Sequence, residues 1–93
     1  MIVGVLTLDF AIFDAQSLKD KRRVVRSVKQ RLQNTFNASV AEVAYADTPK
    51  RCRLAVAMVS TEARPLHAQL DKIVDVVRRC GGLTLLEYER ELY

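Results

Sequence analysis

The sequence predicts an α+β fold in which two helices cover one face of a four-stranded antiparallel sheet. Two long segments carry apolar residues at the 3.6-residue period of a helix, and four shorter segments carry the alternating or continuous apolar pattern of strands. In chain order they read β-α-β-β-α-β, the split βαβ arrangement of a ferredoxin-like sandwich. Because crossover connections are right-handed, the first and third strands are expected in the centre of the sheet and the other two at its edges.

The composition is typical of one folded domain that spans residues 1–93. Hydrophobic residues make up 49% of the chain, which contains 3 Gly and 2 Pro, so one hydrophobic core is expected. The formal net charge of +4 favours a nucleic acid or another acidic partner. Apolar runs are shorter than the roughly 20 residues of a membrane span, and the N-terminus lacks a signal-peptide pattern. We therefore expect a cytoplasmic protein with no membrane partner.

The first strand is predicted over residues 2–13. Alternate residues form one of its faces: Leu6, Leu8, Phe10 and Ile12. The residues between them form the other face: Val3, Val5, Thr7 and Asp9. Because both faces carry apolar side chains, this strand is expected in the centre of the sheet.

The first helix is predicted over residues 17–36. Ser17 can cap its N-terminus, and Asp20 three residues later completes the acidic form of a capping box. Apolar residues then recur at helical spacing along one side: Leu18, Val25, Val28, Leu32 and Phe36. This side is expected to pack against the sheet.

The same helix carries most of the unbalanced positive charge of the chain. Its basic residues are Lys19, Lys21, Arg22, Arg23, Arg26, Lys29 and Arg31, against the single acid Asp20. Lys21 projects closer to the apolar side, so its stem is expected to pack while its amine reaches water. Basic side chains beside the free N–H groups of a helix start favour anions. We predict nucleic-acid contacts by Lys19, Lys21, Arg22, Arg23, Arg26 and Lys29. The alternative is a solvated face with no ligand.

The second strand is predicted over residues 38–46 and the third over residues 51–60. The Asp-Thr-Pro-Lys segment between them is typical of a turn, because Asp favours turn starts and Pro lacks the N–H that a strand needs. Val43 and Tyr45 are expected on one face of the second strand and Glu42 on the other. The third strand is the most continuously apolar run in the chain, so it is expected in the middle of the sheet.

The second helix is predicted to begin within residues 61–65 and to end near Gly81, a residue that favours helix termination. Its buried side consists of Leu66, Leu70, Ile73, Val74 and Val77. Residues 83–92 form the predicted last strand, and three glutamates lie on one of its faces: Glu87, Glu89 and Glu91. Three like charges protect a sheet edge from stray pairing, and they also repel phosphates.

The sheet face opposite the helices is expected to be open. RNA-recognition domains of this topology stack bases on aromatic residues of the central strands, but the candidate outward residues here are small. They are Val3, Val5, Thr7, Asp9, Ala55, Ala57 and Val59. Base stacking on these strands is therefore not expected. The aliphatic residues favour sheet-to-sheet packing in a homodimer, with a modestly apolar free surface as the alternative.

The sequence predicts no catalytic site, no metal site and no cofactor. His67 is the sole histidine, and no Cys or Ser motif accompanies it. Acidic residues lack metal-ligand spacing, and no Gly-rich phosphate loop occurs. We therefore expect neither enzymatic activity nor a small-molecule substrate. Cys52 and Cys80 are expected to be reduced thiols in a cytosolic chain, with a facultative disulfide as the alternative.

The whole chain resembles the YlxP-like family, small bacterial proteins classed as a domain of unknown function. The residues that carry the resemblance are 2–10, Ser17–Arg23, Phe36–Val43, Asp47 and 54–60. Asp20 stands where the family usually has Glu, and residues 48–52 depart from the family's apolar-aromatic turn. The resemblance implies a ferredoxin-like fold, no established enzymatic activity, and genes often found beside those for translation initiation and ribosome-binding factor A. It thereby hints at RNA binding or ribosome maturation.

These observations lead to two hypotheses. The first is a small RNA- or ribosome-associated binding protein whose basic helix contacts phosphates, with Lys50 and Arg51 as candidates to extend the patch. Contacts to phosphates position a protein but read no sequence, so specificity would come from RNA shape. The second is a structural or interaction protein that forms a homodimer through the open sheet face, with no nucleic-acid role.

Overall fold

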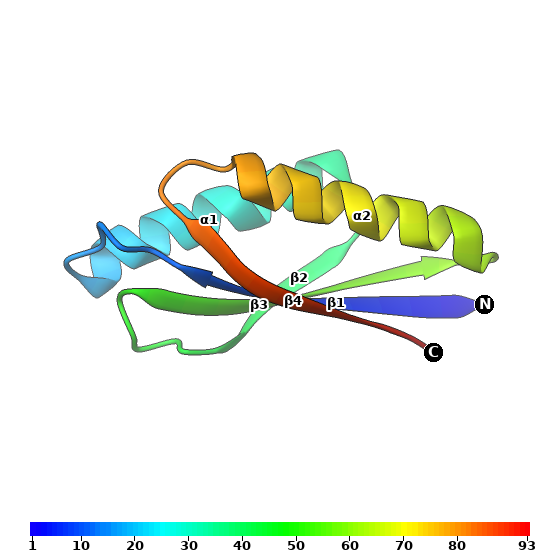
Figure 1. Ribbon diagram of the computed structural model, residues 1–93, viewed down its shortest axis with the longest axis horizontal. Coiled ribbons are helices and arrows are strands. Elements are labelled where there is room, and N and C mark those ends of the chain that lie inside the picture. Colours follow the sequence, from blue (N-terminus) through cyan, green and yellow to red (C-terminus); the bar gives the residue numbers. More distant parts are fainter.

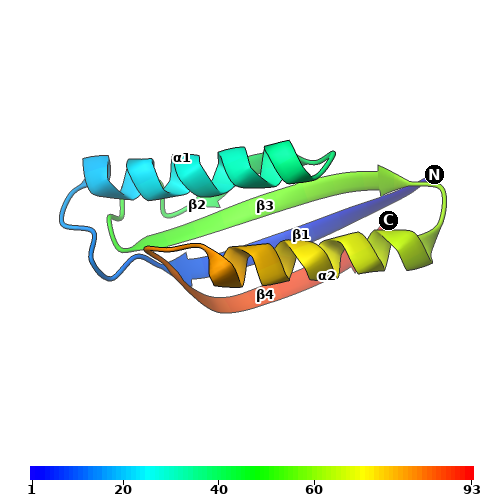
Figure 2. The same cartoon turned by 90° about the horizontal axis from the view of Figure 1, so that it is seen from above.

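Four strands and two helices follow one another in the predicted order in the computed structural model, which describes residues 1–93 (Figure 1). The elements are β1 (Ile2–Ala11), α1 (Leu18–Thr35), β2 (Ser39–Ala44), β3 (Arg51–Ser60), α2 (Ala63–Arg79) and β4 (Thr84–Leu92). All strand pairs are antiparallel, and the strand order is β2-β3-β1-β4. Both helices lie on one face of this sheet (Figures 1 and 2). The predicted ferredoxin-like sandwich is therefore confirmed.

The start of α1 is a capping box, as the sequence predicted. The Ser17 hydroxyl accepts a hydrogen bond from the Asp20 N–H at 3.1 Å, and the Asp20 carboxylate accepts one from the Gln16 N–H at 3.0 Å. These two bonds satisfy backbone donors that a helix start leaves free. The helix ends at Thr35, and Phe36 continues in an extended conformation with its side chain buried.

The core lies between the helices and the facing side of the sheet. Leu6, Leu8 and Phe10 of β1 are fully buried there, and the neighbouring strand β3 contributes Leu54 and Val56. The helices close the core with Val25, Val28 and Leu32 of α1 and with Leu66, Leu70, Ile73, Val74 and Val77 of α2. Because these residues follow the predicted periods, the faces assigned to the central strands and to both helices are correct.

A glycine allows α2 to approach β1 closely. A Cβ atom on Gly4 would lie 2.9 Å from Leu66 Cδ2 and 3.1 Å from Leu70 Cδ1, which is inside normal contact distance. The absence of a side chain at Gly4 therefore gives these two leucines room to cover the end of the central strand.

Strand β2 is shorter than predicted and contains a bulge. The pairing register with β3 shifts between Glu42 and Ala44, so Val43 is the extra residue. The strand ends at Ala44, and Tyr45 has a positive φ of 64°. The extra residue of a bulge bends and twists its strand, and the chain turns toward β3 earlier than a regular alternation predicts.

Strand β4 forms the other edge of the sheet. Its register places Glu87, Glu89 and Glu91 opposite alternate residues of β1, among them Asp9 and Thr7. The three glutamates therefore share the open face, as predicted. No helix of the structure is long and apolar enough to cross a membrane.

Candidate nucleic-acid interface

Five of the six α1 cations predicted to contact nucleic acid lie on the solvent side of the helix. Four of them, Lys19, Arg22, Arg23 and Arg26, are exposed, and Lys29 is half-buried. We call these five residues the basic face of α1. The ion pairs of the structure are Lys21–Glu42, Arg53–Asp9 and Arg90–Asp71, so no residue of the basic face is paired with a carboxylate. The charge of this face is therefore available to an external anion.

Three members of the basic face border one groove. Arg22, Arg26 and Lys29 line a shallow depression of about 440 Å³ between α1 and the edge strand β2. Gln30 and Gln33 supply further polar groups along it. Arg23, one residue beyond Arg22, lines a separate small depression with acidic neighbours. The structure thus concentrates three of the predicted contacts on the β2 side and leaves Lys19 and Arg23 outside this groove.

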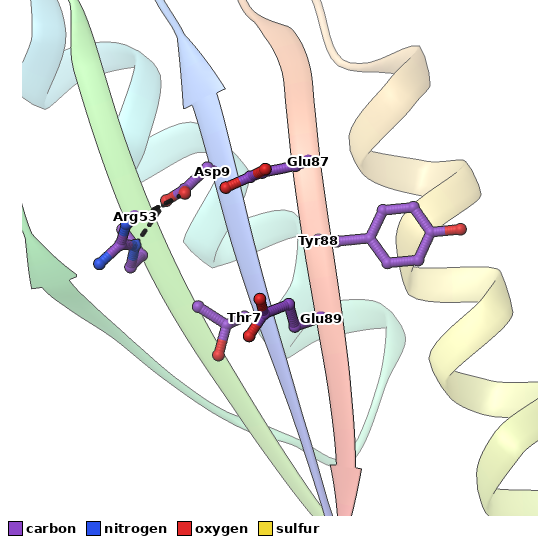
Figure 3. A pocket seen from close by; sticks show the side chains of 6 residues that line it. All are labelled: Thr7, Asp9, Arg53, Glu87, Tyr88 and Glu89. Atoms are coloured by element: carbon purple, nitrogen blue, oxygen red, sulfur yellow. Dashed lines mark hydrogen bonds and ion pairs between the residues drawn. The ribbon is translucent and has the colours of Figure 1, made fainter.

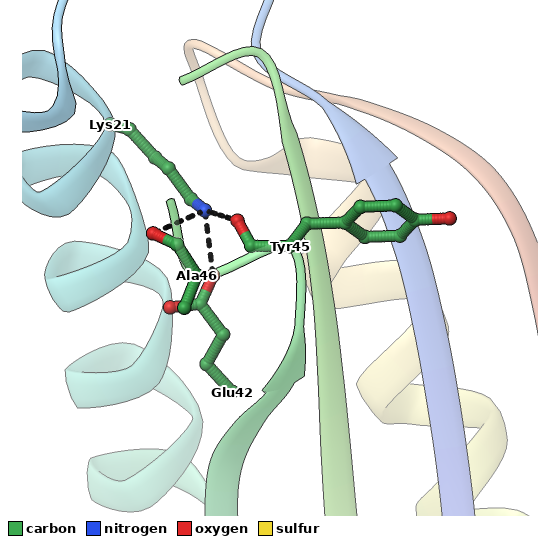
Figure 4. A network of polar contacts seen from close by, with 4 residues as sticks. All are labelled: Lys21, Glu42, Tyr45 and Ala46. Atoms are coloured by element: carbon green, nitrogen blue, oxygen red, sulfur yellow. Dashed lines mark hydrogen bonds and ion pairs between the residues drawn. The ribbon is translucent and has the colours of Figure 1, made fainter. Parts of the chain in front are cut away.

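Lys21 does not belong to the basic face. Its side chain is 1% exposed, and its Nζ lies 2.9 Å from a carboxylate oxygen of Glu42. The same Nζ donates hydrogen bonds to the main-chain carbonyls of Tyr45 and Ala46 (Figure 4). The prediction that this amine reaches water is therefore wrong. The β2–β3 hairpin turns back under α1 and supplies three oxygens to the ammonium, which compensates its burial.

The main-chain carbonyl of Tyr45 is bound by Lys21, and the Tyr45 ring points in the opposite direction. Figure 4 shows its carbonyl pointing toward Lys21 and its ring pointing away from α1. The guanidinium of Arg51 lies 4.9 Å from the ring centroid, and that of Arg53 lies 5.3 Å from it. Both distances are within the range of cation–π contacts. An aromatic side chain therefore stands at the β2 side of the open sheet face, although the central strands supply none.

The two arginines beside Tyr45 differ in their partners. Arg53 donates two hydrogen bonds to the Asp9 carboxylate, at 2.6 and 3.1 Å, and these bonds hold the pKa of Asp9 below its usual value. Asp9 and Arg53 line a cavity of about 260 Å³ with the β4 residues Glu87 and Glu89 (Figure 3). Arg51 has no ion pair, and its Nε is buried without a hydrogen-bond partner. Arg51 is therefore the uncompensated cation of this pair.

The two cysteines and the histidine do not belong to the basic face. Cys52 is buried, and its burial together with the Glu42 carboxylate raises the pKa of its thiol strongly. A thiol in this state is a poor nucleophile. Cys80 is half-buried at the end of α2, and both cysteines are free. His67 contacts Arg90, which is paired with Asp71 on the surface of α2 and β4.

Sequence reasoning missed Tyr45 as a candidate site residue. The alternation of strand residues assigned Tyr45 to a strand face but did not anticipate that β2 ends at Ala44. Two basic residues on the same face of the following strand, Arg51 and Arg53, were a usable signal. Cations at alternate positions beside a hairpin aromatic favour cation–π stacking.

The fold and this surface define a small ferredoxin-like α+β protein with an unpaired basic helix face. The sequence model of a family described as "Protein of unknown function (DUF503)" matches residues 3–90. The chain is 34% identical over 73 residues to the uncharacterized protein YlxP of Bacillus subtilis (strain 168), covering 78% of this chain and 79% of that protein. This chain therefore belongs to the YlxP-like DUF503 family, which confirms the resemblance found in the sequence.

Proposed function

We propose that this protein is a non-enzymatic RNA- or ribosome-associated binding protein that contacts RNA phosphates through the basic face of α1. The observation that carries the proposal is the set of five cations on one helix face with no carboxylate partner. Unpaired Lys and Arg side chains displace the counterions of a phosphate backbone, which is the main source of affinity in nucleic-acid binding.

The groove beside α1 suits a phosphate backbone better than a single small anion. Arg22 and Lys29 are seven residues apart, so their Cα atoms are separated by roughly 10 Å along the helix. Such a spacing allows contacts to more than one phosphate. Gln30 and Gln33 in the same groove can donate to or accept from ribose hydroxyls. This arrangement favours recognition of RNA shape rather than of base sequence.

Charge reversal within the groove is expected to weaken RNA binding. We expect the Arg22→Glu, Arg26→Glu double variant to bind a structured ribosomal RNA fragment at least tenfold more weakly. The slope of log affinity against log salt should fall by about 1.4 to 1.8, because each of the two lost phosphate contacts removes roughly 0.7–0.9 from it. Fluorescence anisotropy across a salt series measures both quantities.

A matched control carries the same change of charge on the other helix. Lys72 and Arg79 are exposed on α2 and form no ion pair. The Lys72→Glu, Arg79→Glu variant should keep most of the wild-type affinity and slope. An equal loss in both variants would show that only net charge matters, and absence of wild-type binding at low salt would remove the RNA proposal.

The open sheet face supports a second candidate, a homodimer with no nucleic-acid role. Val59 is 62% exposed there, beside Val3 in the neighbouring strand. The face also carries opposite charges, with Glu89 on the edge strand β4 and Arg51 on the inner strand β3. A twofold arrangement that places β4 of one copy against β3 of the other pairs these charges.

A charge in the apolar part of this face is expected to prevent dimer formation. If the homodimer forms, sedimentation velocity should give a dimer for the wild type and a monomer for Val59→Lys, because a buried lysine without a partner is costly. Val43→Lys places the same charge on an exposed residue of the β2 edge and should leave the dimer intact. A monomeric wild type at the highest soluble concentration would contradict this candidate.

A further inference from the structure

We infer that Tyr45, assisted by Arg51, is a stacking site for an unpaired RNA base. This inference rests on the proposed RNA-binding function and adds a second contact point to it. The site lies on the open sheet face at the β2–β3 hairpin, on the other side of the hairpin from the basic face of α1. Its ligand class is a single unpaired nucleotide within a structured RNA.

The backbone of Tyr45 is unusual for an aromatic residue. Its φ of 64° lies in the left-handed region, where Gly and Asn are favoured and a bulky residue is strained. The buried ammonium of Lys21 holds this conformation through the Tyr45 carbonyl. A glycine would satisfy the backbone at this position, so the need for a left-handed residue does not explain the aromatic ring.

The ring is placed to receive a base. It stacks near the Arg51 guanidinium, and 37% of the Tyr45 surface remains exposed. Arg51 has no carboxylate partner, whereas Arg53 is neutralised by Asp9. An aromatic ring beside a free arginine is the combination that binds single-stranded nucleic acid, with the base on the ring and the phosphate on the cation.

The site is continuous with the proposed phosphate contacts. Lys21 joins α1 to the hairpin, and the start of α1 and the β2–β3 turn lie at the same end of the molecule (Figure 2). Arg22, the residue after Lys21 in the sequence, lines the groove between α1 and β2. An RNA on the basic face of α1 can therefore extend around the β2 edge to Tyr45. The two central strands separate the β2 edge from β4, the opposite edge strand, which carries the glutamates.

The first experiment compares two RNAs and two substitutions. One RNA is a hairpin with a two-nucleotide bulge, and the other is the same hairpin without the bulge. Wild type should prefer the bulged RNA. Tyr45→Leu should bind the bulged RNA roughly 5- to 150-fold more weakly, the range for removal of one base–aromatic stack, and should lose the preference. Tyr45→Phe should retain it, and equal thermal melting of the two variants confirms that both are folded.

A second experiment detects stacking directly. The chain contains no tryptophan, so Tyr45→Trp introduces a single tryptophan at the site, which can be excited selectively above the absorption of the remaining tyrosines. Its emission should be quenched by the bulged RNA and not by the same RNA with abasic bulge positions.

If Tyr45→Leu binds the bulged RNA like wild type, or if the bound tryptophan is not quenched, the proposed stacking site is wrong. The proposed function still stands in that case when Arg22→Glu, Arg26→Glu weakens binding, and both fail when wild type binds neither RNA.

Discussion

Replacement of Lys21 by methionine is expected to lower the free energy of unfolding by about 3 kcal/mol, at the lower end for breaking a buried ion pair. Methionine replaces the apolar stem of the lysine, ends one atom short of the ammonium position, and removes the charge and the three donors. Glu42 then loses its cation, and the carbonyls of Tyr45 and Ala46 lose theirs. The Glu42 oxygen that pairs with Lys21 is buried. The cost stays at the lower end because 24% of the Glu42 side chain is exposed, so the unpaired carboxylate can turn toward water.

Urea denaturation measures this loss, and two further variants define its origin. Arg22→Met removes the adjacent, exposed charge and should change the stability by no more than about 0.5 kcal/mol. The double variant Lys21→Met, Glu42→Met should be more stable than Lys21→Met alone, because it no longer buries an unpaired carboxylate. A Lys21→Met protein as stable as wild type would contradict the structural role assigned to this lysine.

The second large effect is expected in the core of the sheet. Phe10→Ala should lower the free energy of unfolding by about 4 kcal/mol, since removal of a buried phenyl ring leaves a cavity that the surroundings fill only in part. Phe10 is fully buried in the central strand β1 beneath the helices. For a chain of this size, the melting temperature should fall by roughly 16–32 °C.

Phe13, three residues after Phe10, provides a matched control. Phe13 is 62% exposed in the loop after β1, so Phe13→Ala removes the same ring from water rather than from the core. Its stability should differ from wild type by about 0.5 kcal/mol or less. Thermal unfolding followed by circular dichroism compares the two variants, and equal losses would show that the assignment of the buried face of β1 is wrong.

Local sequence patterns predicted the architecture well because each pattern depends on the residues of a single helix or strand. The capping box at Ser17 located the start of α1, and apolar periodicity identified the buried side of both helices. The alternating glutamates identified β4 as an edge strand. Element boundaries were less accurate at β2, where a bulge at Val43 ended the strand two residues before its predicted end. In so short a segment, one extra residue hardly changes the alternating pattern of a strand, so the bulge could not be recognised from the sequence.

The candidate interface was predicted only in part. Helical spacing correctly separated the five residues of the basic face from the core, since exposure on one helix follows from its own period. Lys21 was assigned to the wrong environment because a helical period gives the direction of a side chain and not what it meets there. Its three oxygen partners come from a hairpin more than 20 residues away in the sequence.

The sequence by itself determined the order of elements, the buried faces, the location of the positive charge and the family to which this chain belongs. These properties follow from residue type and spacing, which are local. The tertiary structure alone decided which cations remain free, that Lys21 anchors the hairpin, and that the Tyr45 ring lies near Arg51 and Arg53 on the open face. Each of these depends on segments distant in the chain that meet only when α1 packs over the β2–β3 hairpin.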